Sequence, residues 1–281
     1  MKRIISTILS VVMVLMLGTV AFAATDGKAL NDTLKSINGT EYTKIEQEQF
    51  AIANSSSNGS EGTNTLYYSG ISVSSADLSE TTVSWLDWYN SLDSDEQLAI
   101  NYVPEELSSL SANSARLNST DVLLSRSGAP VYNPSYWNDS SRIKKANCYA
   151  YSMDVICTTE MKLQPGQLAG QQFQYLTKAS IYAAAQADGS YLGNGRSIVE
   201  TTASSTPGSN QFKVALVIAP GVDYHWYILN SNGRWSHKRG WTEVTDVDAS
   251  GNYIYDPATC DRNYSGANYS QFCGYFMVTR T

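Results

Sequence analysis

The segment between residues 212 and 278 constrains the fold most, because it consists of short β-forming runs separated by turn residues. The runs are rich in β-branched, apolar and aromatic residues and cover residues 212–219, 224–229, 234–238, 253–255 and 274–278. Pro220 and Gly221 end the first run, and a Ser-Asn-Gly turn at 231–233 joins the second to the third. Strands linked by such short turns pair in opposite directions. The sequence therefore predicts an antiparallel sheet.

Helical patterns precede these strands. Apolar periodicity and capping residues predict helices at residues 83–90, 94–102, 148–156 and 171–187. Ser94 and Gln97 fit a capping box, Pro104 ends that helix, and Asn147 can cap the helix that begins at Cys148. Helices followed by an antiparallel sheet make an α+β fold. We expect the helix bearing Cys148 to pack on the sheet, preceded by a mostly helical N-terminal region.

The first residues of the chain have the pattern of a secretory signal peptide. Lys2 and Arg3 are followed by an apolar stretch at residues 4–17 and by Ala-Phe-Ala at 21–23. A membrane anchor is the competing interpretation, because the apolar stretch approaches the length of a span. The small-residue cleavage pattern favours removal after Ala23. We expect a secreted, extracellular protein without stable membrane insertion after signal cleavage.

The chain is predicted to have three parts. Residues 1–23 are the signal peptide, residues 24–130 form a helical and loop region suited to a propeptide or accessory role, and residues 131–281 form one α+β domain. The last part is long enough for an ordinary domain.

Composition narrows the range of functions. Charged residues make up 16% of the chain, below the usual quarter or so, and the formal net charge is −7. Lys and Arg form no long run, so we expect no nucleic-acid partner. The hydrophobic fraction of 42% supports a packed core rather than disorder.

Aromatic residues allow two interpretations. Trp85 and Tyr89 lie at helical spacing, which favours packing on a core over a ligand cage. Trp226, Trp235 and Trp241 flank the predicted hairpin and suit either a core or stacking on sugar or peptide.

The only two histidines of the chain, His225 and His237, stand on the two arms of the predicted hairpin. Imidazole is the side chain best suited to proton transfer near neutral pH. A three-residue loop at 231–233 would put both rings on one face, whereas a two-residue loop would put them on opposite faces. We predict a shared face, with His237 orienting His225.

Cys148 is the candidate nucleophile. The positive end of a helix dipole and the unpaired N–H groups there favour a thiolate, and the Cys148 backbone N–H could also stabilise an oxyanion. We expect its sulfur within hydrogen-bond reach of His225. The alternative is a structural cysteine, buried or bridged to Cys157. Four cysteines allow three full pairings, and Cys260 with Cys273, which flank one loop, is a candidate bridge.

The motif order resembles the papain-like cysteine peptidase and amidase superfamily, particularly its NlpC/P60 and CHAP branches. The strings NCYAY at 147–151, QPG at 164–166, DYHWY at 223–227 and WSHK at 235–238 also resemble a recurrent group of secreted bacterial proteins. The resemblance covers roughly residues 130–281. It implies that Cys148 is the nucleophile, His225 the general base and acid, and His237 the orienting residue. The Cys-Trp and Asp-Cys contexts of these families are absent, and no upstream Gln is placed as an oxyanion donor.

These patterns predict a secreted thiol hydrolase that cleaves peptide or amide bonds by Cys-His acyl transfer, with a peptide or peptidoglycan-like substrate. The alternative is a non-catalytic extracellular binding module with disulfide-bonded cysteines. No cofactor or metal is expected. Residues 246–257 open like a calcium loop, but Pro257 stands where a bidentate Glu belongs. The histidines and cysteines lack the close spacings of zinc sites.

Overall fold

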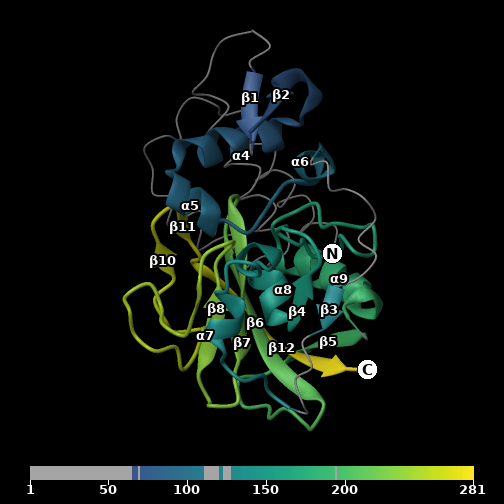
Figure 1. Cartoon of the computed structure of the whole chain (residues 1–281), viewed down its shortest axis with the longest axis vertical. Coiled ribbons are helices and arrows are strands. Elements are labelled where there is room, and N and C mark those ends of the chain that lie inside the picture. The colour runs from purple at the N-terminus through teal and green to yellow at the C-terminus, as the bar shows by residue number, and fades with distance from the viewer. Residues whose placement is uncertain (1–64, 69, 111–119, 123–127, 194) are drawn as a thin grey trace, which may run out of the picture. The chain divides into compact units, whose positions relative to one another are not determined.

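The computed structural model describes residues 65–68, 70–110, 120–122, 128–193 and 195–281. All of them lie in the second of two compact units, Thr43–Thr281. The predicted signal peptide lies outside the described residues. The fold is α+β, as predicted, with a six-stranded antiparallel sheet as its centre (Figure 1).

The strand order of this sheet is β5-β12-β6-β7-β8-β9. The strands are β5 (Arg196–Thr201), β6 (Gln211–Ala219), β7 (Asp223–Leu229), β8 (Trp235–Lys238), β9 (Val244–Thr245) and β12 (Gln271–Arg280). Eight of the nine residues of β6 are buried. Seven of these eight are apolar, the exception being Lys213, as suits a strand that is covered on both faces.

The described residues also form three two-stranded antiparallel pairs. They are β1 (Thr65–Tyr68) with β2 (Ile71–Ser74), β3 (Thr120–Val122) with β4 (Val155–Cys157), and β10 (Asn263–Tyr264) with β11 (Ala267–Asn268). The strand expected at 253–255 is wrong, because only an isolated bridge joins Tyr253 to Val247. Tyr253 and Tyr255 are both exposed, so no packed face stabilises a longer strand.

The described helices are α4 (Glu80–Ser91), α5 (Ser94–Ala99), α6 (Glu105–Leu110), α7 (Pro134–Trp137), α8 (Cys148–Ser152) and α9 (Lys178–Asp188). Three 3-10 turns are η1 (Ser75–Asp77), η2 (Ile143–Lys145) and η3 (Gly189–Tyr191). The predicted capping box is one residue too late, since Asp93 caps α5 and Glu96 bonds back to it. Helix α8 is shorter than expected because Asp154 adopts a left-handed φ of 55° and β4 follows at once.

Two hydrophobic clusters cover the two faces of the sheet. Helix α8 packs on β7 and β8, where Tyr149 contacts Trp226 and the Tyr151 hydroxyl lies 2.6 Å from Ser236 Oγ. The other cluster joins residues of the N-terminal region to Val217 and neighbouring sheet residues; these are Val73, Trp85, Leu86, Ile100, Val103 and Leu107. The described part of residues 65–110 is therefore built onto the sheet. The predicted boundary at 130/131 stays a prediction.

Of the tryptophans singled out in the sequence, Trp85, Trp226 and Trp235 pack in the core, whereas Trp241 is partly buried and belongs to neither cluster. Trp85 stacks on Tyr89 with ring centroids 4.9 Å apart, and its Nε1 donates to the Val222 carbonyl at 2.8 Å. Trp226 and Trp235 are buried. Among the described helices, none is long and apolar enough to cross a membrane.

Candidate functional site: a buried Cys-His-His cluster

The hairpin has the register that brings the histidines together. Tyr227 pairs with His237, and the Asn230 N–H donates to the Arg234 carbonyl at 2.9 Å, so the loop has three residues. Gly233 supplies the positive φ of 80° that this loop needs. Both imidazoles therefore lie on one face, and His225 Nε2 is 2.9 Å from His237 Nδ1. The predicted shared face is confirmed.

The hydrogen bonds fix the tautomers of both rings. His237 Nε2 lies 3.0 Å from the Val247 carbonyl, which can only accept, so this nitrogen carries the proton. His237 Nδ1 then accepts from His225 Nε2–H. His225 Nδ1 is left without a proton, and the Asn101 amide nitrogen lies 3.3 Å from it. A neutral His225 thus presents a basic nitrogen toward Asn101.

Cys148 lies at the first position of α8, as predicted. Asn147 caps the helix by accepting from the Ala150 N–H, and Cys148 is fully buried. Its sulfur is 4.0 Å from the Tyr224 carbonyl, at the edge of β7. Within the described ranges, no hydrogen bond joins this sulfur to either imidazole. The hydrogen bond expected between the Cys148 sulfur and His225 is therefore not formed, and the sulfur faces the Tyr224 carbonyl instead.

Asn101 stands between the two groups. Its Oδ1 accepts from the backbone N–H of Cys148 at 3.1 Å and of Gly240 at 2.8 Å. Its Nδ2 is 3.2 Å from Asp223 Oδ2 and 3.3 Å from His225 Nδ1. One carboxamide therefore links the helix N-terminus to the imidazole pair. Asn101 was not predicted as a site residue because the sequence placed it inside a helix at 94–102, whereas α5 ends at Ala99, before Pro104 is reached. Its one signal is a polar residue within the apolar string LAINYV at 98–103.

Asp223 anchors this arrangement. Its fully buried carboxylate accepts from the backbone N–H groups of Asn101, Tyr102 and Tyr224 and from the Tyr269 hydroxyl at 2.6 Å. Buried carboxylates need such donors. Asp223 thus holds the chain segment that carries Asn101 against β7.

Burial keeps the cluster neutral. It raises the pKa of the Cys148 thiol well above its usual value, and the nearby Asp223 carboxylate adds to this. It lowers the pKa of His225 well below its usual value, helped by His237 and Arg239. The pKa of His237 falls to about 4 for the same reason. The described state therefore holds a thiol and two imidazoles, not a thiolate–imidazolium pair.

Lys238 shapes the turn that follows β8. Its buried Nζ donates to the carbonyls of Ile143 at 2.6 Å, Gly240 at 3.1 Å and Thr242 at 2.9 Å. Desolvation lowers the pKa of Lys238 to about 7. These bonds fix the turn whose Gly240 N–H points at Asn101.

All four cysteines are free thiols. The bridge considered between Cys260 and Cys273 is absent because the two side chains belong to clusters on opposite faces of the sheet. Their sulfurs lie near the carbonyls of Pro257 and Gln271 instead. The bridge considered between Cys148 and Cys157 is also absent, although both are buried in one cluster.

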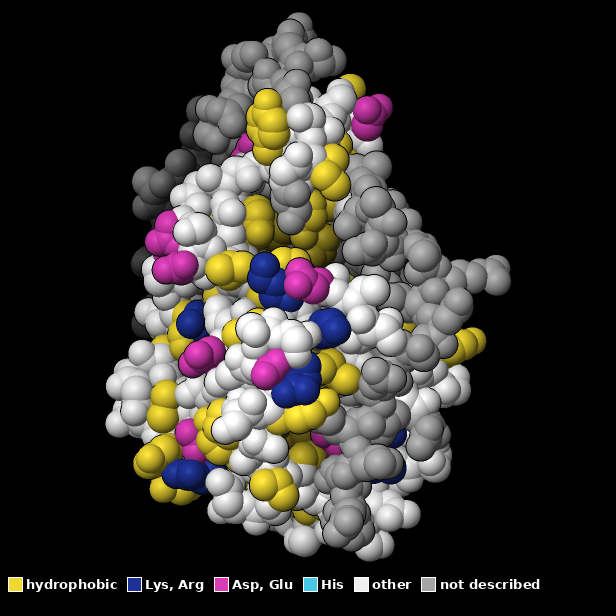
Figure 2. All heavy atoms as spheres, viewed as in Figure 1, with side chains coloured by type: hydrophobic (Ala, Val, Ile, Leu, Met, Phe, Trp, Pro, Cys, Tyr) yellow, Lys and Arg dark blue, Asp and Glu magenta, His cyan; other side chains and the backbone are white. Residues whose placement is uncertain are grey.

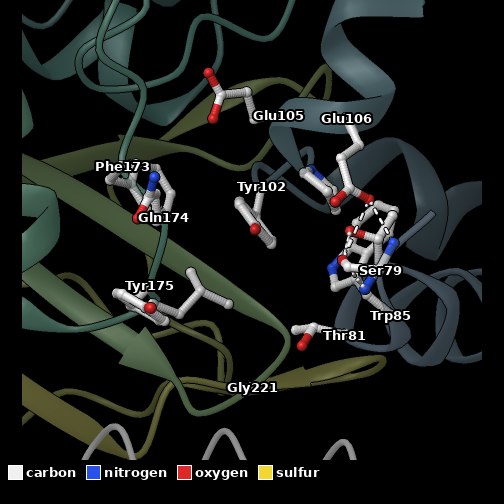
Figure 3. A pocket seen from close by; sticks show the side chains of 13 residues that line it. Ser79, Thr81, Trp85, Tyr102, Glu105, Glu106, Phe173, Gln174, Tyr175 and Gly221 are labelled. Atoms are coloured by element: carbon white, nitrogen blue, oxygen red, sulfur yellow. Dashed lines mark hydrogen bonds between the residues drawn. The ribbon is translucent and has the colours of Figure 1, made fainter.

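A pocket of about 360 Å³ is lined by residues of 79–85, 102–106 and 173–176 together with Gly221 (Figure 3). Trp85, Tyr102 and Phe173 contribute its aromatic walls, and Glu105 and Glu106 its carboxylates. Neither Cys148 nor the histidines line it. In keeping with their burial, no histidine is visible on the face drawn in Figure 2. Among the described residues, no three His, Cys, Asp or Glu side chains gather as metal ligands.

Comparison with known proteins places the chain in a family. No family model and no solved structure matches it. Insoluble matrix shell protein 1 of the clam Ruditapes philippinarum is 34% identical over 147 residues, which span 52% of this chain and 88% of that protein. The chain belongs to the family of this protein. A shell matrix is extracellular, so the predicted secreted localisation is borne out.

Proposed function

We propose that the protein is a secreted thiol hydrolase that cleaves peptide or amide bonds, and that its site is closed to substrate in this structure, where Cys148 is buried. The observation that carries the proposal is the imidazole pair. The Val247 carbonyl fixes the tautomer of His237, and His237 in turn fixes the tautomer of His225. The unprotonated Nδ1 of His225 faces the carboxamide of Asn101, whose oxygen accepts from the Cys148 N–H. A base with a fixed tautomer beside a helix-terminal cysteine is the arrangement that thiol acyl transfer requires.

The residues would divide the reaction as follows. The Cys148 thiol gives its proton to His225 Nδ1 while its sulfur attacks the carbonyl carbon of a bound amide. The carbonyl oxygen becomes an oxyanion on the N–H groups of Cys148 and Gly240, which already converge on one oxygen. The carbon–nitrogen bond breaks and the amine leaves with the proton from His225. Water, deprotonated by His225, then hydrolyses the thioester to an acid and restores the thiol.

Variants of the cysteines test this proposal. Cys148→Ala should abolish the release of free amines from casein or peptidoglycan fragments under reducing conditions, because it removes the sulfur on which the proposed thioester forms. Cys157→Ala is the matched control, because Cys157 is a buried thiol in the same hydrophobic cluster as Cys148, and burial raises its pKa to about 12. Unchanged hydrolysis in Cys148→Ala would refute the proposal.

The catalytic histidines should differ in importance. His225→Ala should lose about as much activity as Cys148→Ala, since it removes the base. His237→Ala should retain part of it, because an orienting group contributes less than the base that it holds. Equal activity in His225→Ala and wild type would contradict these roles.

Family membership favours a second candidate, a non-catalytic component of an extracellular matrix. The closed and neutral cluster would then serve stability alone. This candidate predicts that wild type and Cys148→Ala partition equally into insoluble matrix and that neither hydrolyses any amide tested.

A further inference from the structure

We infer that the side chain of Asn101 is a built-in amide ligand of the acyl-transfer site and that residues 97–103, here named the strap, keep the site closed. The inference rests on the proposed function, because it assigns the site's ligand class and its regulation. A substrate would enter as a carboxamide or peptide amide that takes the place of Asn101.

The contacts of Asn101 are those expected of a substrate. A scissile amide must present its oxygen to the oxyanion donors and its nitrogen to the general acid. Asn101 Oδ1 accepts from the N–H groups of Cys148 and Gly240, and its Nδ2 donates to His225 Nδ1.

The orientation of the carboxamide is determined by its neighbours. The two N–H groups at Oδ1 can only donate, and Asp223 at Nδ2 accepts. Asn101 therefore does not serve as an oxyanion donor, since its nitrogen points away from the Cys148 N–H. Its oxygen occupies the position in which the N–H groups of Cys148 and Gly240 would bind the carbonyl oxygen of a substrate.

The strap is bound along its length by the rest of the fold. Four of its backbone carbonyls accept hydrogen bonds from outside the strap, and one of its N–H groups donates to Asp223; all five bonds are 2.7–2.9 Å long. The donors to the carbonyls of Gln97, Leu98, Asn101 and Val103 are Lys162 Nζ, the Trp241 N–H, Gln164 Nε2 and Gln172 Nε2, and the N–H group is that of Tyr102. Asn101 itself is fully buried. A substrate amide cannot reach Cys148 while these bonds hold.

The test compares alkylation of Cys148 with hydrolysis in the full chain. Asn101→Gly removes the carboxamide, and Gln164→Ala removes a strap anchor without touching Cys148 or the histidines. Thr177→Ala, which removes the N-cap of α9, lowers stability elsewhere and serves as control. Iodoacetamide labelling is located by peptide mass spectrometry.

We expect Cys148 to be alkylated ~10-fold faster or more in Asn101→Gly and Gln164→Ala than in wild type and Thr177→Ala, because the closed population falls. Hydrolysis dependent on Cys148 should rise in parallel. Acetamide, which supplies the missing carboxamide, should protect Cys148 in Asn101→Gly and leave the labelling of Cys260 unchanged.

The outcomes separate this inference from the proposed function. The inference would be overturned if Asn101→Gly and Gln164→Ala both fold and their Cys148 is alkylated no faster than in wild type. Wild-type hydrolysis that neither variant raises would also overturn it, and the hydrolase would then stand. Faster labelling with protection by acetamide, but no hydrolysis in any variant, would support the amide site and refute the hydrolase.

Discussion

At the scale of single residues, the cluster depends on polar groups that are buried and paired. Asn101 uses both hydrogens of its amide nitrogen and both lone pairs of its oxygen within the protein. Asp223 accepts from four different residues. Leaving such a group without partners costs more than its hydrogen bonds contribute when formed. The cluster should therefore tolerate few substitutions.

Asp223→Asn should be strongly destabilising although the side chain keeps its shape. The new amide hydrogens would face N–H groups that need an acceptor, at a cost of about 1–3 kcal/mol or more. Asp248→Asn is the matched control, because Asp248 also accepts from three backbone N–H groups but is only half-buried. Urea unfolding measures both. An equal loss in the two variants would contradict the anchoring role of Asp223.

The depressed pKa values of the histidines predict loss of stability in acid. At pH values below 6.5, the usual pKa of histidine, His237 is protonated in the unfolded chain. In the folded chain its pKa is about 4, so the ring stays neutral down to about that pH. Its contribution is therefore complete above pH 6.5 and falls by on the order of 3 kcal/mol as the pH drops to 4. Asp188, whose pKa burial raises to about 6, acts in the opposite direction.

Comparing wild type with His237→Gln measures the titration of His237 together with its lowering of the pKa of His225. The variant should lose less stability than wild type between pH 7 and pH 4.5 in thermal unfolding, because Gln does not titrate while Asp188 is common to both. Parallel pH profiles would show that His237 does not titrate as described.

The sequence predicted the histidine pair and a direct hydrogen bond from Cys148 to His225, but not Asn101, which connects the two. Hairpin periodicity and one turn decide the face of His225 and His237, so local information suffices. The position of Asn101 depends on bonds to residues more than 40 positions away, and no local pattern encodes them. The same holds for the pairing of Cys260 with Cys273, which the loop suggested and the two sheet faces prevent.

At the scale of elements, the strap and the turn after β8 fit closely. A Cβ on Gly240 would lie 2.1 Å from the Leu98 carbonyl oxygen and 2.8 Å from that of Ile100. Gly233, in the hairpin loop, also has a positive φ but nothing within 4 Å of the same position. The two glycines therefore differ in their contact with the strap.

Gly240→Ala should destabilise the protein by more than Gly233→Ala. The second variant suffers backbone strain of about 1 kcal/mol, whereas the first must also displace the strap. Urea unfolding of the pair measures the difference. A loss no larger in Gly240→Ala would contradict the tight contact between strap and turn.

Elements with a strong pattern were predicted best. Strands β6, β7 and β8 lie within one residue of the predicted bounds, whereas β12 (Gln271–Arg280) extends beyond the predicted run 274–278 at both ends. Helix boundaries were less accurate: α9 begins at Lys178 rather than 171 because Thr177 caps it. A cap depends on one side-chain bond, which periodicity does not reveal.

At the scale of the whole molecule, an extracellular protein with four free thiols makes a distinctive prediction. Denatured without reductant, the protein should yield four reactive thiols with Ellman's reagent. In the native state, Cys260 should react first because the other three cysteines are buried. Two thiols or fewer in the denatured protein would show that disulfides form and would contradict the description of the core.

Direct observation of an acyl-enzyme tests whether Cys148 is the nucleophile. Asn101→Gly is incubated with the 4-nitrophenyl ester of an N-acetylated peptide, quenched in acid and measured by intact mass spectrometry. We expect one added acyl group, located on Cys148 and absent from the same variant that also carries Cys148→Ala. An unmodified Cys148, in folded protein whose thiol iodoacetamide still alkylates, would contradict it.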